Sequence, residues 1–335
     1  MESTAAYNLS NIYLRLKELG IDKRYIHEVL LPEWWNDEML TTKAGFIQTA
    51  STIAKNLSVG LSELLDTGAT LALKTPIEIR FKTRNRQGSL ADQFFPNSIS
   101  AKLSKVVFKS FGNEIEINPS TSFEIRREYF TRNKFLDLAG LTDFLWSKGI
   151  PVVYISKIPA KVPKFDGMTY KINGRPIIVV SSKRAQDAWL LFILAHELGH
   201  IFLGHLSDSE NGIIDTDISE LNNSEEEQAN NYAIEFLIND INNLPSKTIM
   251  SNPFKIANVA RECARLLQVD PGQVALMTAY RDKTFPTVSK ALNILNPNAD
   301  AAAVIKSKMA EHLKLDELSG EDREFFERIT GLTGE

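Results

Sequence analysis

The feature that most constrains this chain is a pair of histidines at the end of a long apolar segment. His196, Glu197 and His200 form an HExxH pattern, and the residues from Ala188 to Ala195 before it are all apolar. Residues four apart share one face of a helix, so the two imidazoles can bind one metal ion. A surface helix would carry a polar face, so we expect this helix to run through the centre of its domain.

Glu197 stands beside the position that a metal bound by the two histidines would leave open. A purely structural metal site gains nothing from an acid there, whereas hydrolysis requires a general base. Burying Glu197 without a charged partner would cost several kcal/mol, which disfavours two plain core histidines as the explanation. We therefore predict one Zn²⁺ ion per chain, with Glu197 as the catalytic base.

A third protein ligand is expected, because catalytic zinc sites have three and keep the fourth place for water. Metzincins have Gly and His three and six residues after the second histidine, but Leu203 and Leu206 stand there. His205 would lie about 180° from His196 on a continued helix, and Gly204 should end the helix first. We interpret His205 as a residue at the surface or behind the ligands.

The better candidate for the third ligand is Glu226. Ser224 and Glu227 have the spacing of a capping box, which would start a helix that runs to about Leu237. If Glu226 faces the metal, most other side chains on the same helical face are small or of medium size: Ala229, Asn230, Ala233 and Leu237. Asn230 could then orient a histidine. A metal-facing Glu225 would instead bring the bulkier side chains of Gln228, Tyr232 and Phe236.

The segment before the apolar helix predicts a small sheet. We expect a helix over 131–148, a strand over 152–155 and a hairpin over 168–180, with Asn173-Gly174 as a type I′ turn. The HExxH helix should then begin at a cap on Ser181 or Ser182 and end at Leu203. One edge of the hairpin strand 168–172 is predicted to accept a peptide substrate as an added strand.

These elements in this order resemble the ImmA/IrrE family of zinc metallopeptidases over about 120 residues. The resemblance rests on the Asn-Gly hairpin, Arg-Pro-Ile-Ile-Val-Val at 175–180, Ala-His-Glu-Leu-Gly-His at 195–200 and Glu226-x-Gln-Ala-Asn-x-Tyr-Ala. It implies an α+β fold, a minimal gluzincin-like zincin domain with a small antiparallel sheet, flanked by helical regions. It also implies metal ligands at His196, His200 and Glu226 and the base at Glu197. Ile193 and Gln228 depart from the usual Thr and Glu without touching the metal.

The family resemblance implies an endopeptidase that cleaves an XRE-type transcriptional repressor and relieves repression in stress, mobile-element or phage-defence settings. One alternative is the toxin of a toxin-antitoxin pair, whose peptidase attacks a host protein. Another is a transcription regulator that binds nucleic acid through residues 1–130 and keeps a structural zinc site.

The predicted domains are a helical module (1–70), a mixed basic connecting segment (71–124), the peptidase domain (125–245) and a helical C-terminal region (246–335). Residues 44–65 resemble the last helices of an XRE-type helix-turn-helix domain. Residues 1–68 carry six basic and nine acidic side chains, a poor surface for phosphates, so a protein-interaction module is favoured over a DNA reader. Residues 77–82 alternate like a strand whose Arg and Lys protect an exposed edge.

Composition narrows the remaining choices. The net charge is −4, and the single cysteine, Cys263, is expected to be a buried apolar thiol. No apolar run approaches the roughly 20 residues of a bilayer span, so we expect a cytoplasmic protein without a membrane contact. Tyr170, Tyr232 and His205 are candidate donors for the oxyanion. Residues 206–227 hold eight acidic and no basic side chains, which favours a basic substrate segment if they border the cleft.

Overall fold

The Asn173-Gly174 turn joins two strands into the hairpin that the sequence predicts. In the computed structural model both turn residues have positive φ (47° and 77°), as a type I′ turn requires. The structure describes residues 8–71, 79–83, 90–111, 117–162, 165–206, 219–244 and 252–332. Within them, the hairpin strands are β3 (Phe165–Ile172) and β4 (Arg175–Val180).

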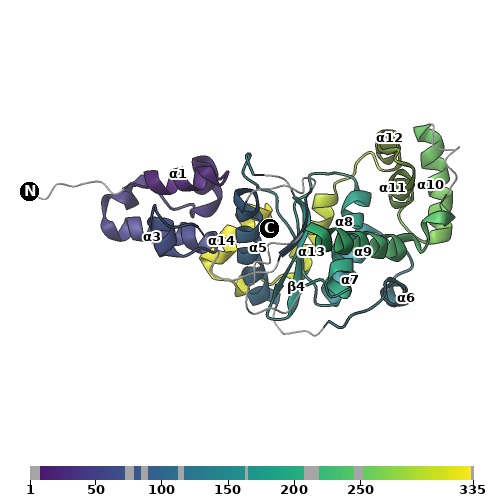
Figure 1. Ribbon diagram of the computed structural model, residues 1–335, viewed down its shortest axis with the longest axis horizontal. Helices are drawn as coiled ribbons and strands as arrows, with labels where there is room; N and C mark the ends of the chain where they lie inside the picture. Colours follow the sequence, from purple (N-terminus) through teal and green to yellow (C-terminus); the bar gives the residue numbers. More distant parts are fainter. Residues whose placement is uncertain are drawn as a thin grey trace, which may run out of the picture.

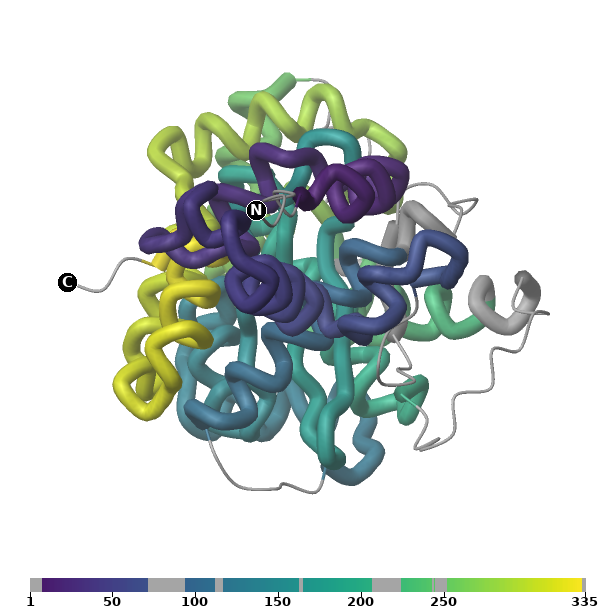
Figure 2. The backbone as a smooth tube through the Cα atoms, turned by 90° about the vertical axis from the view of Figure 1, so that its left-hand side faces the viewer, coloured from purple at the N-terminus to yellow at the C-terminus, as the bar shows by residue number. Residues whose placement is uncertain are grey.

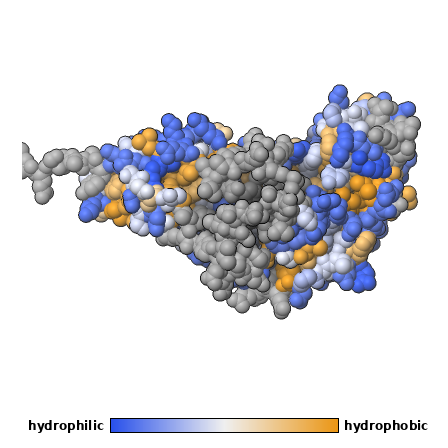
Figure 3. Space-filling model, viewed as in Figure 1, coloured by the Kyte–Doolittle hydropathy of each residue, from blue (hydrophilic) through white to orange (hydrophobic). Residues whose placement is uncertain are grey.

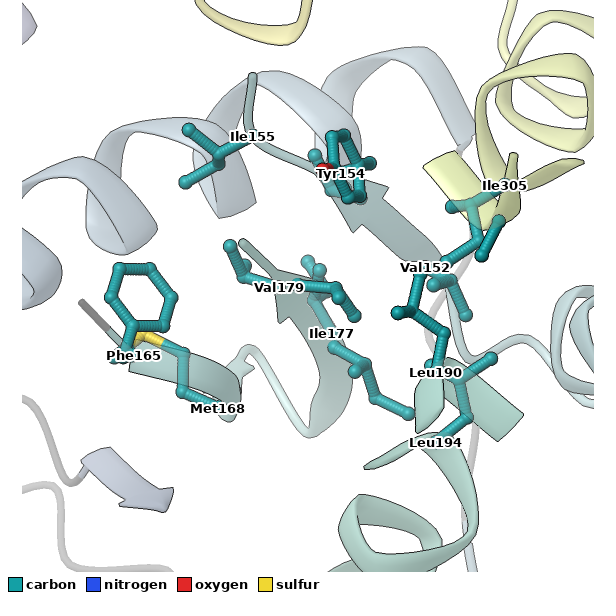
Figure 4. Packing of buried hydrophobic residues seen from close by; sticks show 14 of the residues in the cluster. Val152, Tyr154, Ile155, Phe165, Met168, Ile177, Val179, Leu190, Leu194 and Ile305 are labelled. Carbon is teal, nitrogen blue, oxygen red and sulfur yellow. The ribbon is translucent and has the colours of Figure 1, made fainter. Parts of the chain in front are cut away.

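The hairpin lies at the centre of a four-stranded sheet with the order β1-β3-β4-β2. Strand β2 (Val152–Tyr154) pairs in parallel with β4, and β1 (Ile79–Thr83) pairs antiparallel with β3. The strand predicted over 152–155 is therefore confirmed, and so is the part of the strand predicted over 77–82 that the structure describes, residues 79–82. Among the described strands β1 is at an edge, as its charges suggest. In the core, Val152 of β2 lies beside Leu190 of α8 and Ile305 of α13 (Figure 4).

Helix α8 (Asp187–Phe202) carries the HExxH residues and is buried at every position from Leu190 to Phe202. It begins later than predicted, because Ser181 and Ser182 hold the chain to the sheet. The Ser181 hydroxyl donates to the Phe165 carbonyl, and the Ser182 carbonyl accepts a hydrogen bond from the Tyr154 hydroxyl at 2.9 Å. The prediction of a cap at Ser181 or Ser182 is wrong.

Two further helix boundaries differ from the prediction. The helix expected over 131–148 is two helices, α6 (Ser122–Arg132) and α7 (Leu138–Ser147), because the side chain of Asp137 caps α7 at the Gly140 N–H. Helix α9 (Ser219–Ile238) begins five residues before Ser224. Ser224 is therefore inside the helix, and the predicted capping box does not form.

The N-terminal region is helical, as predicted. Its elements are α1 (Ser10–Glu18), α2 (Lys23–Tyr25), the π-helical turn η1 (Ile26–Leu30), the 3₁₀ turn η2 (Asp37–Thr41), α3 (Lys43–Asn56) and α4 (Leu61–Leu65). The helix predicted over 44–65, with a break before Leu61, corresponds to α3 and α4. Between α2 and α3 the chain forms short turns in place of regular helices.

The remaining helices lie beside the sheet or at the end of the molecule opposite the N-terminal helices (Figure 1). They are α5 (Leu90–Phe111), η3 (Ile241–Asn243), α10 (Pro253–Leu267), α11 (Pro271–Asp282), α12 (Phe285–Leu295), α13 (Ala301–His312), η5 (Leu315–Glu317) and α14 (Gly320–Thr330). The N-terminal helices and α10–α12 lie at opposite ends, with the sheet between them (Figure 1). Cys263 on α10 is half-buried, so the expected buried thiol is only partly enclosed.

Helix α14 joins the N-terminal helices to the sheet. The Ile329 carbonyl accepts hydrogen bonds from the N–H groups of Ser156 and Lys157, directly after β2. On its other side Lys55 of α3 pairs with Glu321 at 2.9 Å. Seen along the long axis, the N-terminal helices lie in front of the body with α14 beside them (Figure 2).

The fold class is α+β, with a small zincin-like domain at its centre. On the face shown in Figure 3, hydrophilic and hydrophobic residues are interspersed over the N-terminal helices and over α10–α12. Among the described residues, none of the helices combines the length and apolarity that a bilayer crossing requires.

Candidate metal centre

His196, His200 and Glu226 converge on one point between α8 and α9. The two histidine Nε2 atoms are 3.1 Å apart, and the Glu226 carboxylate oxygens lie 3.4 Å from His196 Nε2 and 3.3 Å from His200 Nε2. The three ligand atoms lie within 4.8 Å of one another. The structure thus brings together the three residues that the sequence analysis proposed as ligands.

Small residues let the two ligand helices approach closely. A Cβ atom added to Gly199 on α8 would lie 3.1 Å from the Cα and carbonyl oxygen of Ala229 on α9. Ala229 and Ala233 are fully buried. Glu226 is one turn from this crossing, so its short reach to the histidines depends on the absence of larger side chains.

A hydrogen bond to Asn230 orients the first histidine. His196 Nδ1 lies 3.1 Å from Asn230 Oδ1, which can only accept, so His196 carries its proton on Nδ1. The Nε2 atom of His196 then presents a lone pair to the site. Asn230 lies one turn after Glu226, where the sequence analysis placed an orienting group.

A longer relay orients the second histidine. Gln228 Nε2 donates to Ser224 Oγ, which turns Gln228 Oε1 toward His205 Nε2 at 3.1 Å. His205 therefore donates from Nε2 and accepts at Nδ1, 3.0 Å from His200 Nδ1. His200 donates there, so its Nε2 atom also presents a lone pair to the site.

The resulting site suits a divalent cation. Two lone pairs and a carboxylate at these distances repel one another unless a proton or a cation lies between them. Two imidazoles and one carboxylate are a donor set that zinc uses in hydrolases.

Glu197 points from the same helix toward strand β3. Its Oε2 atom accepts a hydrogen bond of 2.8 Å from Thr169 Oγ1, and the side chain is fully buried. A Cβ atom added to Gly167 would lie 3.0 Å from Glu197 Oε1 and 2.5 Å from Ile193 Cγ2. Glycine at 167 therefore gives the carboxylate room directly below β3.

The structure argues against the three candidate oxyanion donors. Tyr170 neighbours Thr169 on β3 and so faces the opposite side of the sheet, where burial raises its pKa to about 12. Burial raises the pKa of the Tyr232 hydroxyl, and the charges of Glu124 on α6 and Glu235 on α9 raise it further. Both ring nitrogens of His205 are engaged in the relay to His200.

His205 itself is buried and lies behind His200, so of the two positions expected for it the surface one is wrong. The hairpin edge predicted to accept a substrate is also not open, because β3 pairs with β1 on one side and β4 on the other. The acidic segment 206–227 falls largely outside the described residues at 207–218.

Sequence reasoning missed Thr169 and the relay through Gln228. Gly167 within a strand was a usable signal, since a strand glycine often marks a close approach of another group. Thr169, two residues after Gly167, has its side chain on the same face of the sheet. The relay had no local signal, because Gln228 and His205 meet only when α8 and α9 cross.

Comparison with known proteins identifies the central part of the chain. Residues 147–275 match the family model described as the IrrE N-terminal-like domain, Peptidase_M78. The match spans β2, β3, β4, α8 and α9 and therefore contains every residue of the candidate metal centre. No curated protein and no solved structure is significantly similar to the chain.

Proposed function

Because residues 147–275 belong to the IrrE N-terminal-like peptidase family, we propose that this protein is a zinc-dependent endopeptidase. The observation that carries the proposal is the convergence of His196, His200 and Glu226, with Glu197 on the same buried helix. His196, His200 and Glu226 would hold the ion. Zinc bound there would polarise the scissile carbonyl and lower the pKa of water from 15.7 to about 7.

The chain's own residues supply the rest of the chemistry. Glu197 would accept the proton of the attacking water and return it to the leaving amine. Thr169 donates a hydrogen bond to one oxygen of the Glu197 carboxylate, which fixes the direction of that side chain. Asn230 and His205 keep the two histidines in the tautomers that present Nε2 to the ion.

We propose an XRE-type repressor or antitoxin as the protein substrate. The resemblance to ImmA/IrrE peptidases supports this class, and so does charge. Eight acidic and no basic residues occur between 206 and 227, and DNA-binding proteins offer basic segments. Cleavage would release genes that the repressor holds silent.

Two other functions predict different results. A nucleic-acid-binding regulator with a structural zinc site would not need Glu197. A toxin would slow growth when expressed without a partner, and the Glu197→Gln variant would not.

The test measures zinc content and cleavage of a candidate XRE-type repressor. We compare wild type with Glu197→Gln, Glu226→Ala and, as a matched control on the same helix, Glu225→Ala. We expect full zinc in wild type, Glu197→Gln and Glu225→Ala, reduced zinc in Glu226→Ala, and cleavage only by wild type and Glu225→Ala. Full zinc in Glu226→Ala, or cleavage by Glu197→Gln, would contradict the proposal.

A further inference from the structure

The strand directly above Glu197 is β3, and this position limits where a substrate can bind. Thr169 of β3 contacts the Glu197 carboxylate, and Gly167 lies over it. A general base works within hydrogen-bond reach of the reacting water, at about 2.6–3.2 Å. A peptide that adds to β3 lies about 4.8 Å from that strand, whereas a peptide one strand farther out lies about 10 Å away.

The backbone groups of β3 show which edge such a peptide would use. The Ile178 N–H donates to the Pro151 carbonyl beside β2, so even-numbered residues of β4 turn their polar groups toward β2 and odd-numbered residues toward β3. Ile177 is paired with Tyr170 and Val179 with Met168, so the backbone N–H and C=O groups of even-numbered β3 residues point toward β4. Gly167 and Thr169, the two residues over Glu197, turn their backbone groups to the opposite edge.

That edge is covered by β1. Arg80 is opposite Thr169 and Phe81 is opposite Met168 in an antiparallel register. The backbone N–H and C=O of Thr169 point toward β1, so Arg80 is the residue of β1 that pairs with Thr169 through backbone hydrogen bonds. The N–H of Phe81 points away from β3. A substrate strand would need the same Thr169 groups.

Strand β1 is an addition to the peptidase domain. The family match at 147–275 includes β2, β3 and β4 but not β1, and without β1 the edge strand of the sheet is β3. Residues 72–89, which include β1, carry five basic side chains and one acidic one. The chain thus lays β1, whose sequence has two basic residues and no acidic one, on the edge beside the candidate catalytic base.

We infer that β1 occupies the place of the substrate, so that a peptide must displace residues 79–83 to reach Glu197. The inference rests on the proposed peptidase function and extends it to substrate class and control. The substrate is an extended or locally unfolded segment with alternating apolar and basic residues, like Ile79-Arg80-Phe81-Lys82. Paired β1 keeps the enzyme latent, and release of β1 from β3 activates it.

The test uses binding as well as activity. The probe is a fluorescein-labelled peptide with the sequence of residues 76–86, added to the zinc-loaded full chain in a Glu197→Gln background. Arg80→Pro removes the N–H that pairs with Thr169, whereas Phe81→Pro removes an N–H that faces away and serves as the matched control. Replacement of residues 79–83 by Gly-Ser-Gly-Ser-Gly is a second way to release the edge, and circular dichroism and zinc content check folding.

We expect Arg80→Pro and the Gly-Ser replacement to bind the probe about 10-fold or more tightly than the Glu197→Gln parent, as for a site that is open in 10% of molecules or fewer. Phe81→Pro should bind like the parent. Hydrogen exchange of residues 165–172 should be faster in Arg80→Pro and slow again with the probe. With Glu197 restored, Arg80→Pro should cleave its substrate faster than wild type.

Equal or weaker probe binding by Arg80→Pro and by the Gly-Ser replacement would overturn the inference, since it would mean that the substrate adds to the outer edge of β1 or binds elsewhere. Tighter probe binding without cleavage by any variant would support the covered edge and count against the proposed peptidase function. The two ideas therefore fail separately.

Discussion

Thr169 Oγ1 donates a hydrogen bond of 2.8 Å to Glu197 Oε2 and so ties strand β3 to the middle of helix α8. A fully buried carboxylate is costly unless hydrogen bonds or charges compensate it. The threonine supplies one such bond from β3, the strand to whose edge a substrate would add. It positions Glu197 relative to the sheet without touching the candidate metal ligands.

We expect Thr169→Val to lower kcat/KM about 10- to 150-fold, because a hydrogen bond to a charged group contributes about 1.5–3 kcal/mol. Zinc content should not change, since Thr169 is not a ligand. Thr169→Ser keeps the hydroxyl and should retain most activity. The measurement is the rate of repressor cleavage together with zinc content, and a loss of zinc in Thr169→Val would contradict the assigned role.

Asn230→Ala should weaken zinc binding about 10- to 100-fold, the usual effect of removing a group that orients a ligand. His196 Nδ1 would lose its acceptor, and the ring could turn away from the site. Competition with a chelator measures the affinity. Asn231→Ala, a change at the exposed neighbouring position of α9, should bind zinc like wild type, and equal affinities for the two variants would argue against the orienting role.

Gly199→Val should both destabilise the protein and weaken zinc binding. The new side chain would meet the Ala229 backbone at 3.1 Å and force α8 and α9 apart, and overpacking costs about 1–3 kcal/mol. Urea unfolding and zinc affinity are the measurements. Gly320→Ala is the control, because a Cβ atom there has no neighbour within 4 Å. Unchanged zinc affinity in a folded Gly199→Val protein would show that the ligands tolerate a wider crossing.

Asp322→Asn should destabilise the protein by about 3–5 kcal/mol, the cost of leaving a buried charge without its partner. Asp322 on α14 is 2% exposed and accepts hydrogen bonds from Lys102 at 2.5 Å and Lys109 at 2.9 Å on α5. Glu321→Gln, the matched change at the exposed neighbour, should alter stability by less than about 1 kcal/mol.

The effect of Asp322 should depend on pH. Burial raises the pKa of Asp322, but hydrogen bonds from Lys102 and Lys109 outweigh it and hold the folded-state pKa well below the usual range. A depressed folded-state pKa stabilises the native state above the unfolded-state pKa of about 3.9, and the stabilisation declines as pH falls below it. The difference between wild type and Asp322→Asn should therefore be full at pH 7 and shrink below about pH 4. A difference that is constant from pH 7 to pH 3 would contradict this explanation.

Short-range patterns in the sequence predicted the hairpin turn and the buried HExxH helix. The positive φ angles of Asn173 and Gly174 and the shared face of His196 and His200 follow from residues at most four apart. Such features need no knowledge of distant neighbours. Glu226 was reached by asking which helical face could approach another helix, and the structure places it beside both histidines.

The helix starts and the site's surroundings were decided by tertiary structure. Ser181 and Ser182 are residues that often cap helices, but here the Ser181 hydroxyl donates to the Phe165 carbonyl and the Ser182 backbone carbonyl accepts from the Tyr154 hydroxyl. Both contacts hold this segment to the sheet, and α8 begins at Asp187. His205 orients His200 only because Gln228 arrives from a crossing helix. The sequence by itself therefore determined the local geometry of the metal ligands. Packing between distant segments decided what orients them and what covers the edge of β3, because such contacts depend on the path of the whole chain.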